Sequence, residues 1–470
     1  MARKEILERR TFVSSEKALA RFVARPVLQF IQLEVAGGIL LLVATAAALI
    51  WVNSPWQESY HELWETTIAF GVGGLIDFEE PLEAFVNDAL MAVFFFVVGL
   101  EIKRELVVGQ LSDGRAAALP AIAALGGMVV PALVFTAFNW GGEGSAGWGI
   151  PMATDIAFAL GVVALLGSRV HPRLKLFLLA LAIVDDIGAI TVIAIFYTDD
   201  LSLGWLPVAG LGLVAVVVLQ RLRVWSLTPY LAIGLVVWYA TFESGVHATI
   251  AGVLLGLLTP ARPLLSVEEA TEMVPDLSGG IDVSNASQVS FVAKESVSVA
   301  DRLEYVLHPW SSFLIIPVFA LANAGIELSS EALSEAATSP VTIGVVLGLV
   351  VGKPVGIVLF TWVATLFGLR LPRGMDWPQF IGMGIAAGIG FTVSIFIAGL
   401  AFGDEVLRDD AKIGILVGSA AAAVLGLAVL RTFCRGPIVS EEELSEQVNA
   451  DLADAPAQGE HPSVGSPARG

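Results

Sequence analysis

Four ionisable residues lie deep inside apolar runs of this sequence: Asp155, Asp185, Asp186 and Lys353. The middle of the run 174–197 falls on the Asp185–Asp186 pair itself. Each such charge costs about 2.5–3.5 kcal/mol at the centre of a membrane helix. Ion pairs that only hold helices together would recover part of this cost, but leucine would avoid it altogether. The four residues therefore favour an ion or proton pathway over a purely structural role.

The adjacency of Asp185 and Asp186 restricts how they can be used. Neighbours on one helix project about 100° apart, because a turn takes about 3.6 residues. The two carboxylates therefore need different partners, and one can face an ion while the other pairs with a cation such as Lys353. Burial and a nearby like charge both disfavour the ionised form. Such a pair can hold either protons or a sodium ion, and that competition is the chemistry of an exchanger.

The runs that carry these residues indicate a membrane protein. Hydrophobic residues make up 56% of the 470 positions and charged residues 15%, against about 25% charged in soluble domains. The single cysteine, Cys434, excludes an intrachain disulfide and a cysteine metal cluster. We count twelve runs that approach the length of about 20 residues needed to span a bilayer. They are 34–52, 85–107, 117–138, 147–167, 174–197, 204–220, 226–241, 246–259, 308–326, 341–367, 377–401 and 411–433.

Lysine and arginine alternate between the loops that connect these runs. The segment 1–30 is rich in both, whereas 53–84 and 327–340 contain neither. Positive loops stay in the cytoplasm, so we expect twelve spans in a bacterial inner membrane with both termini cytoplasmic. Only Arg408 and Lys412 break the alternation.

These patterns predict an all-α polytopic membrane protein. We expect a cytoplasmic arm at 1–30, a twelve-helix domain at 31–436, and a disordered acidic cytoplasmic tail at 437–470. We expect the acidic loop 262–303 to be a mobile cytoplasmic insertion. The short stretch 66–78, with glycines in its middle, is expected to form an external hairpin.

Two of the runs are interrupted near their middle by proline, glycine and polar residues: Pro151, Thr154 and Asp155 in 147–167, and Gly388, Gly390 and Thr392 in 377–401. Unwound backbone at this depth is tolerated only where it lines a cavity or is buried in protein. Each interrupted run is the middle one of three, which predicts two inverted three-helix repeats with two broken crossing helices. Half-helix N-termini carry partial positive charge and C-termini partial negative charge. Asp155 would balance the former and Lys353 the latter.

At these residues the sequence resembles the NhaA-type sodium/proton antiporters, over about 30 to 436. The similar strings are NDALMAVFF at 87–95, GLEIKREL at 99–106, ATDIAFALG at 153–161, ALAIVDDIGAI at 180–190, SGVHAT at 244–249, LHPW at 307–310, NAG at 323–325, GKP at 352–354 and GIGFTVSIFI at 388–397.

The resemblance implies roles for the transport residues. Asp186 is expected to be the cation ligand and proton carrier, with Asp185 as its partner, so that sodium binds at this pair. Asp185 is expected to pair with Lys353 when the ion is absent, and Thr154 and Asp155 are expected to line the site. The implied activity is electrogenic exchange of Na⁺ or Li⁺ for H⁺ by secondary active transport. The chain would be no enzyme and would need no cofactor.

The resemblance also implies regulation and assembly. Activity is expected to rise at alkaline pH under the control of Glu101, Arg104, Glu105, His247 and Glu304. Here Asp301 precedes Arg302, where the family is basic, which leaves the pH threshold open. For His247 a packed neutral side chain is an equal alternative to a pH sensor. A homodimer is expected, formed partly through the hairpin, with the lipid bilayer as the other partner and no nucleic acid.

Three other functions compete with exchange. A sodium-coupled symporter also uses broken helices and midplane carboxylates, but it needs a cavity for an organic solute. A channel rarely places an acidic pair and a lysine in broken helices. An intramembrane protease would need two aspartates on separate helices facing one another, whereas Asp185 and Asp186 point apart. Substrate-dependent proton counterflow separates an exchanger from all three.

Overall fold

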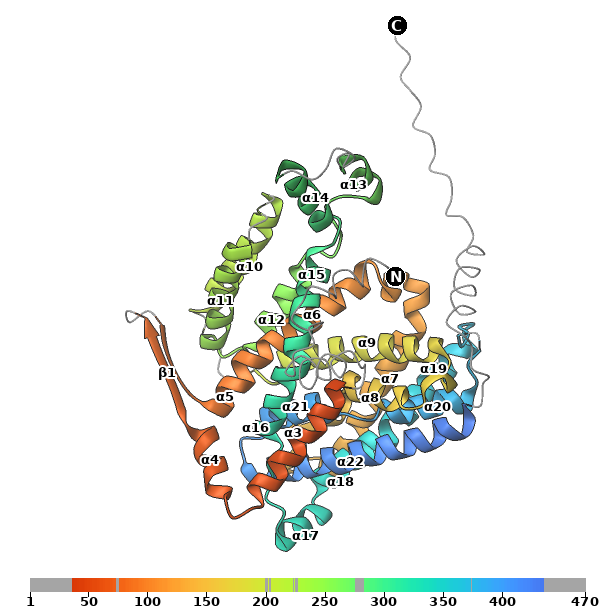
Figure 1. Ribbon diagram of the computed structural model, residues 1–470. Helices are drawn as coiled ribbons and strands as arrows, with labels where there is room; N and C mark the ends of the chain where they lie inside the picture. Colours follow the sequence, from red (N-terminus) through yellow and green to blue (C-terminus); the bar gives the residue numbers. More distant parts are fainter. Residues whose placement is uncertain are drawn as a thin grey trace, which may run out of the picture.

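The computed structural model describes residues 36–72, 76–198, 202, 204–222, 224, 227–274, 283–372 and 374–434. The predicted arm at 1–30 and the tail at 437–470 lie outside these residues. Within them the fold consists of helices and one two-stranded hairpin. Figure 1 shows the helices α13 and α14 at one end of the molecule and α17 at the opposite end, with the hairpin projecting from the side.

Six helical stretches among the described residues are long and apolar enough to cross a membrane. They are α5–η2–α6 (Leu82–Phe85, Val86–Leu90, Met91–Val107), α7 (Gly114–Asn139), α9 (Pro172–Phe196), α15–η6–α16 (Val299–Trp310, Ser311–Ile315, Ile316–Asn323), α18–η7–α19 (Pro340–Leu347, Gly348–Gly352, Lys353–Leu366) and α22 (Glu405–Phe433). The three segments labelled η2, η6 and η7 are π-helical turns inside longer helices. Such turns often mark functional positions.

In three further cases, two consecutive helices are together long and apolar enough to cross a membrane, but they bend by more than 40° at a short break. They are α3 with α4 (Ala36–Val52, Gln57–Glu65), η4 with α8 (Glu143–Met152, Ile156–Ala164) and α20 with α21 (Trp377–Ala386, Phe391–Ala401). If each bent pair counts as one span, the described residues contain nine spans. Shorter helices occupy the remaining apolar runs: α10 (Leu206–Arg221), α11 (Leu227–Glu243) and α12 (Thr249–Leu258). Every predicted run therefore coincides with a helix or a helix pair, while twelve crossings and inverted repeats stay predictions.

The loops contain more structure than their composition indicates. Within the predicted mobile insertion 262–303, α13 (Val267–Met273) and α14 (Val283–Glu295) form and α15 begins at Val299. The mobility of this segment stays a prediction. A capping box at Ser266 and Glu269 starts α13, which stabilises even a short helix in an acidic segment. Three more short helices connect the long ones: η3 (Gln110–Ser112), η5 (Gly167–Arg169) and α17 (Ser330–Thr338).

The hairpin predicted at 66–78 is confirmed. Strands β1 (Thr67–Val72) and β2 (Ile76–Pro81) pair antiparallel, with Thr67 opposite Pro81. Its base is anchored by Phe78, which is fully buried and lies against the rings of Trp238 and Phe242 in α11.

The helices form two groups according to which elements touch. The first group, here the crossing bundle, comprises α7, η4, α8, α9, α18–η7–α19, α20, α21 and α22. The second, here the flanking bundle, comprises α3, α4, α5–η2–α6, α12 and α15–η6–α16. Contacts between the bundles include α3 with α8, α16 with α21 and α6 with α9. Many more contacts join helices within each bundle than between them.

Glycines allow α7 and α19 to cross in the crossing bundle at backbone distance. A Cβ at Gly126 would overlap the Gly356 carbonyl oxygen and lie 2.6 Å from Cγ of Phe360. A Cβ at Gly352 would lie 2.8 Å from Cα of Pro131. Small residues at such crossings replace the hydrophobic effect, which is weak between helices in lipid. This crossing fixes the position of Lys353, the first residue of α19.

We expect Gly126→Ala to lower the free energy of unfolding by about 1–3 kcal/mol, because the added methyl group forces the backbone of α7 away from α19. The matched control is Gly210→Ala in α10, where a Cβ meets nothing within 4 Å. Thermal unfolding of the purified protein in detergent measures both changes. Equal destabilisation by the two variants would contradict a close crossing at Gly126.

Candidate functional site

The two broken helices of the crossing bundle meet at their interruptions. The bend is 46° between η4 and α8 and 47° between α20 and α21. The Asp155 N–H donates to the Ile389 carbonyl at 2.7 Å, which joins one break to the other. The predicted interruptions are therefore present, and they contact each other through their backbones. Backbone groups at the ends of the half-helices, which a continuous helix would satisfy internally, are therefore brought together at one place.

Asp155 serves the N-termini of both half-helices. Its Oδ1 accepts from the Phe158 N–H of α8 at 3.0 Å, and its Oδ2 accepts from the Thr392 N–H and hydroxyl at 3.3 and 2.7 Å. A carboxylate is favourable there because the helix ends carry unsatisfied donors and partial positive charge. This arrangement agrees with the balance expected for Asp155 from the sequence.

Lys353 lies against a helix C-terminus, whereas Asp155 lies at two helix N-termini. Its Nζ donates to the carbonyl of Met152, the last residue of η4. The same Nζ lies 2.8 Å from Oδ2 of Asp185, and both side chains are 0% exposed. The π-helical turn η7 directly precedes Lys353. The ammonium thus balances a carbonyl-rich helix end and a buried carboxylate together.

The Thr154 hydroxyl links Asp185 to the second break. Its Oγ1 lies 2.7 Å from Oδ2 of Asp185 and 2.9 Å from the Ala387 carbonyl oxygen. A hydroxyl carries one proton and can donate to only one of these acceptors. An ionised Asp185 can accept from Thr154, whereas a protonated Asp185 can donate to it, which frees the threonine proton for Ala387. The orientation of this hydroxyl therefore depends on the protonation of Asp185.

Asp186 has a different environment from its neighbour. It is 8% exposed, and the described part of the chain provides no hydrogen bond or ion pair to its carboxylate. Its electrostatic neighbours are Asp185, Glu101, Lys353 and Asp155. Oδ1 of Asp185 is also buried without a hydrogen-bond partner among the described residues. Asp185 and Asp186 therefore both have carboxylate oxygens that are available to bind a ligand.

The described residues contain no group of three or more His, Cys, Asp and Glu side chains that could hold a metal ion. A cation at Asp185 and Asp186 would therefore need further oxygen ligands. Carbonyl groups of unwound helices serve this purpose in transporters. The two breaks supply such carbonyls beside the carboxylates.

The residues expected to control pH response fall into two places. Arg104 on α6 forms an ion pair with Glu304 on α15, with Nη1 and Oε1 2.7 Å apart. Glu101 lies one turn earlier on α6 and interacts electrostatically with Glu304. Oε2 of Glu105 accepts from the Gln110 N–H at 2.9 Å. Glu101, Arg104, Glu105 and Glu304 therefore form one charged group.

His247 lies apart from that group. Its Nε2 is 3.9 Å from Oδ1 of Asp88 in η2, and its Nδ1 is 3.0 Å from the Thr249 hydroxyl. Its ring meets Phe396 edge-on. Asp88 and Arg104 are sixteen positions apart on one helical stretch, so about 24 Å separates the two places.

Sequence reasoning missed two serines that hold the second break. The Ser419 hydroxyl oxygen on α22 accepts from the N–H groups of Gly390 and Phe391, both at 3.3 Å. The Ser394 hydroxyl donates to the Ile150 carbonyl at 2.7 Å. Neither residue interrupts an apolar pattern, so no local signal marks them. A Cβ at Gly390 would overlap the Ser394 hydroxyl, which explains the glycine at that position.

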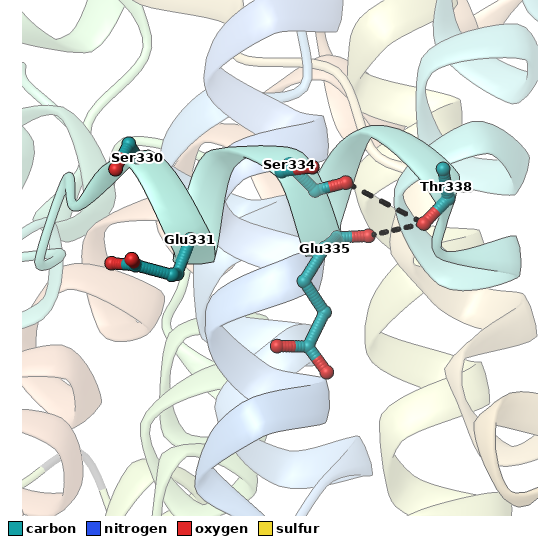
Figure 2. Close-up of a pocket in the computed structure, with 5 residues that line it drawn as sticks. All are labelled: Ser330, Glu331, Ser334, Glu335 and Thr338. Carbon is teal, nitrogen blue, oxygen red and sulfur yellow. Dashed lines mark hydrogen bonds between the residues drawn. The ribbon is translucent and has the colours of Figure 1, made fainter.

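An open hollow elsewhere on the surface is not part of this site. It lies along α17 and is lined by Ser330, Glu331, Ser334, Glu335 and Thr338 (Figure 2). The Thr338 hydroxyl turns back to the Glu335 carbonyl at 3.0 Å, so its polar group is already satisfied within the helix. None of the residues predicted for transport lines it.

The chain is similar to known sodium/proton antiporters in every comparison that follows. The family model for Na⁺/H⁺ antiporter 1 matches residues 28–430. The chain is 50% identical over 415 residues to the Na⁺/H⁺ antiporter NhaA 3 of Frankia alni, covering 87% of this chain and 89% of that protein. It is 47% identical over 417 residues to the NhaA antiporter of Rhodopirellula baltica, covering 86% and 93%. It is 44% identical over 432 residues to NhaA 2 of Sorangium cellulosum, covering 89% and 92%.

We expect Lys353→Met to lower the free energy of unfolding by about 3–5 kcal/mol, because it leaves the Asp185 charge buried and unpaired. The double variant Lys353→Met with Asp185→Asn should recover most of that loss, since no bare charge remains. Lys294→Met, at an exposed position of α14, is the matched control and should change little. Denaturant unfolding in detergent tests this, and a double variant as unstable as Lys353→Met would contradict an electrostatic coupling.

Proposed function

The chain belongs to the Na⁺/H⁺ antiporter 1 family, and from this premise we propose that Asp185 and Asp186 bind sodium and protons in competition during transport. One observation carries the proposal. A buried Asp185–Lys353 ion pair lies beside Asp186, whose carboxylate has no partner in the described residues, where two broken helices meet. A pair of carboxylates with unequal partners can exchange one kind of cation for another.

In the proposed cycle, Asp186 is the first ligand of the cation. Sodium displaces its proton, because one carboxylate oxygen cannot hold both. Asp185 then turns its unpartnered Oδ1 toward the ion and gives up Lys353, which keeps its bond to the Met152 carbonyl. When sodium leaves, the Asp185–Lys353 pair forms again and protons return. The Thr154 hydroxyl follows these changes by turning between Asp185 and Ala387.

Thr154 and Asp155 have different parts in this proposal. Thr154 lines the ion site directly through its contact with Asp185. Asp155 holds the half-helices α8 and α21 in register through their N-termini, and Gly388, Gly390 and Thr392 supply the backbone of the second break. The chain thus acts as a secondary active transporter and carries out no bond-making chemistry on a substrate.

The exchange is proposed to be electrogenic. Asp186 releases one proton when sodium binds, and Lys353 releases a second when its ion pair with Asp185 breaks, so more protons enter than sodium ions leave. Each net charge that crosses the membrane gains roughly 2.3 kcal/mol per 100 mV. A potential negative inside would then drive sodium out. Lithium, the other small alkali cation, is proposed to use the same oxygen ligands.

Activation at alkaline pH is proposed to act through Glu101, Arg104, Glu105 and Glu304, with His247 contributing separately beside Asp88. The Arg104–Glu304 ion pair joins α6 to α15, so a change of charge there would alter how the two helices pack. Asp301 lies one turn before this pair on α15 and interacts with Glu304. We therefore expect the activating pH of this chain to differ from that of relatives with a basic residue there.

The assembly is proposed to be a homodimer in the bacterial inner membrane, with both termini in the cytoplasm. The β1–β2 hairpin projects from the helices (Figure 1) and leaves the backbone groups at the edges of a two-stranded sheet available for pairing. Exposed sheet edges pair readily with other strands. The alternation of basic loops supports the orientation.

Exchange itself is tested in everted vesicles from a host that lacks other antiporters. We expect NaCl or LiCl, but not KCl, to collapse a respiratory pH gradient reported by a pH-sensitive dye, more strongly at alkaline pH. Asp186→Asn should abolish the response, because an amide cannot exchange a proton for sodium. Asp404→Asn is the matched control: Asp404 is exposed and caps α22, and asparagine caps equally well. A full response from Asp186→Asn would remove that residue from the mechanism.

Electrogenicity is tested separately in proteoliposomes loaded with ²²Na⁺. A potassium gradient with valinomycin sets a potential that is negative inside. We expect this potential to accelerate sodium efflux at constant pH, since net positive charge enters with each cycle. Efflux that does not respond to the potential would mean that equal charges are exchanged.

A further inference from the structure

The half-helix η4 is a 3₁₀-helix over ten residues, Glu143–Met152. Runs of this form longer than three or four residues are uncommon, because their hydrogen-bond geometry is poorer than that of an α-helix. The other two 3₁₀ segments of the described residues, η3 and η5, contain three residues each. Contacts from outside η4 are therefore needed to hold it in this form.

One such contact is the hydroxyl of Tyr197, the residue that follows α9. It donates to the Ala146 carbonyl at 2.7 Å and accepts from the Gly149 N–H at 3.2 Å. These two backbone groups lie three residues apart, so they are the pair that a 3₁₀ turn joins, whereas an α-helix joins groups four residues apart. The hydroxyl therefore bridges one turn of η4 in the 3₁₀ register.

Packing around the bridge leaves room for this hydroxyl. A Cβ at Gly149 would lie 2.8 Å from the Tyr197 hydroxyl oxygen and 3.2 Å from its Cε2. The Trp148 ring stacks on the Tyr197 ring with 6.5 Å between centroids, and it meets the Phe196 ring edge-on at 5.1 Å. Glycine at position 149 thus admits the hydroxyl, and Trp148 holds the ring that carries it.

The other end of η4 reaches the ion site. The carbonyl of its last residue, Met152, accepts from Lys353, which pairs with Asp185 on α9. Tyr197 follows the same helix, twelve residues after Asp185. Asp185, Lys353, η4 and Tyr197 therefore form a closed circuit of contacts. Within this circuit the length of η4 decides where the Met152 carbonyl lies.

We propose that Tyr197 is a positioning residue for the ion site, whose hydroxyl keeps η4 in the long 3₁₀ form so that the Met152 carbonyl reaches Lys353. A 3₁₀-helix rises about 2.0 Å per residue and an α-helix about 1.5 Å. Without the bridge, η4 can relax toward the α-form, which shortens its ten residues by about 5 Å and withdraws that carbonyl. The effect on transport rests on the proposed antiport function, in which Lys353 keeps this bond while Asp185 turns to the ion.

The length of η4 is measured by the distance between spin labels at the two ends of the broken helix. Glu143→Cys and Leu165→Cys, at exposed positions, carry nitroxides in a Cys434→Ser background, which removes the single native cysteine. Double electron–electron resonance of the purified protein in detergent reports this distance and needs no ion transport. Tyr197→Phe should shift the mean distance to shorter values, by up to about 5 Å.

Tyr230→Phe is the matched control. The Tyr230 hydroxyl also donates to a backbone carbonyl, that of Val224 at 3.0 Å, but it belongs to α11, so the label distance should not change. Gly149→Ala adds a methyl group that displaces the Tyr197 hydroxyl, and it should shorten the distance as Tyr197→Phe does. Both changes act on one contact, so the double variant should be no shorter than either single variant. An unchanged distance in Tyr197→Phe, or additive shortening in the double variant, would overturn the bridge.

The kinetics of exchange separate positioning from a role in folding alone. In everted vesicles, Tyr197→Phe should raise the apparent KM for sodium about tenfold, as expected for the loss of one hydrogen bond to a charged group. The reason is that Lys353 loses the Met152 carbonyl and competes more strongly with sodium for Asp185. A purely structural role would instead lower the amount of active protein and thus the maximal rate, with KM unchanged. A shorter label distance with an unchanged KM would also overturn the proposal, since the form of η4 would not matter to the ion site.

The two readouts distinguish the role of Tyr197 from the proposed function. If the label distance shortens in Tyr197→Phe while the original chain exchanges no sodium for protons, the bridge stands and antiport fails. If exchange is intact and neither the distance nor the KM responds, antiport stands and the role of Tyr197 fails.

Discussion

The need to leave no bare charge in the apolar interior determines the structure around Lys353. Its ammonium is fully buried and meets the Asp185 carboxylate and the Met152 carbonyl together. Either contact alone would leave a charge or a helix end unsatisfied in a medium that offers no water. The close crossing of α7 and α19, made possible by Gly126 and Gly356, fixes where this ammonium lies. The ion pair therefore depends on backbone packing less than one turn from Lys353.

The broken helices are stable because their free ends satisfy one another. Asp155 accepts from donors at the start of α8 and α21, and Ser419 accepts from two more donors at the start of α21. Irregular backbone within an apolar region is thereby buried in protein, and these hydrogen bonds satisfy its helix N-termini. The same arrangement leaves Oδ1 of Asp185 and the Asp186 carboxylate without partners among the described residues. The proposed function places the cation at these oxygens.

The proposed exchange requires one part of the protein to move against another, and the division into two bundles provides two such parts. In transporters built of inverted repeats, one repeat or bundle moves against the other around a fixed site. Few contacts join the bundles, and those beside α22 include the apolar packing of Ile413 with Ile326 and Leu49. Packing within the crossing bundle, by contrast, has to remain intact for the ion site to keep its shape.

The sequence by itself determined the apolar runs, the four ionisable residues inside them and the two interruptions. Each of these is a local departure from composition or periodicity, and burying the ionisable residues costs too much free energy to be accidental. It also predicted the pairing of Asp185 with Lys353, through its resemblance to a family. It did not predict the helices within the loop 262–303, where capping allows helices in an acidic segment. Only the tertiary structure decided that Ser419 caps α21 and that Ser394 donates to the Ile150 carbonyl. These partners are far apart in sequence, and contacts made by chain packing leave no periodic signal along the chain.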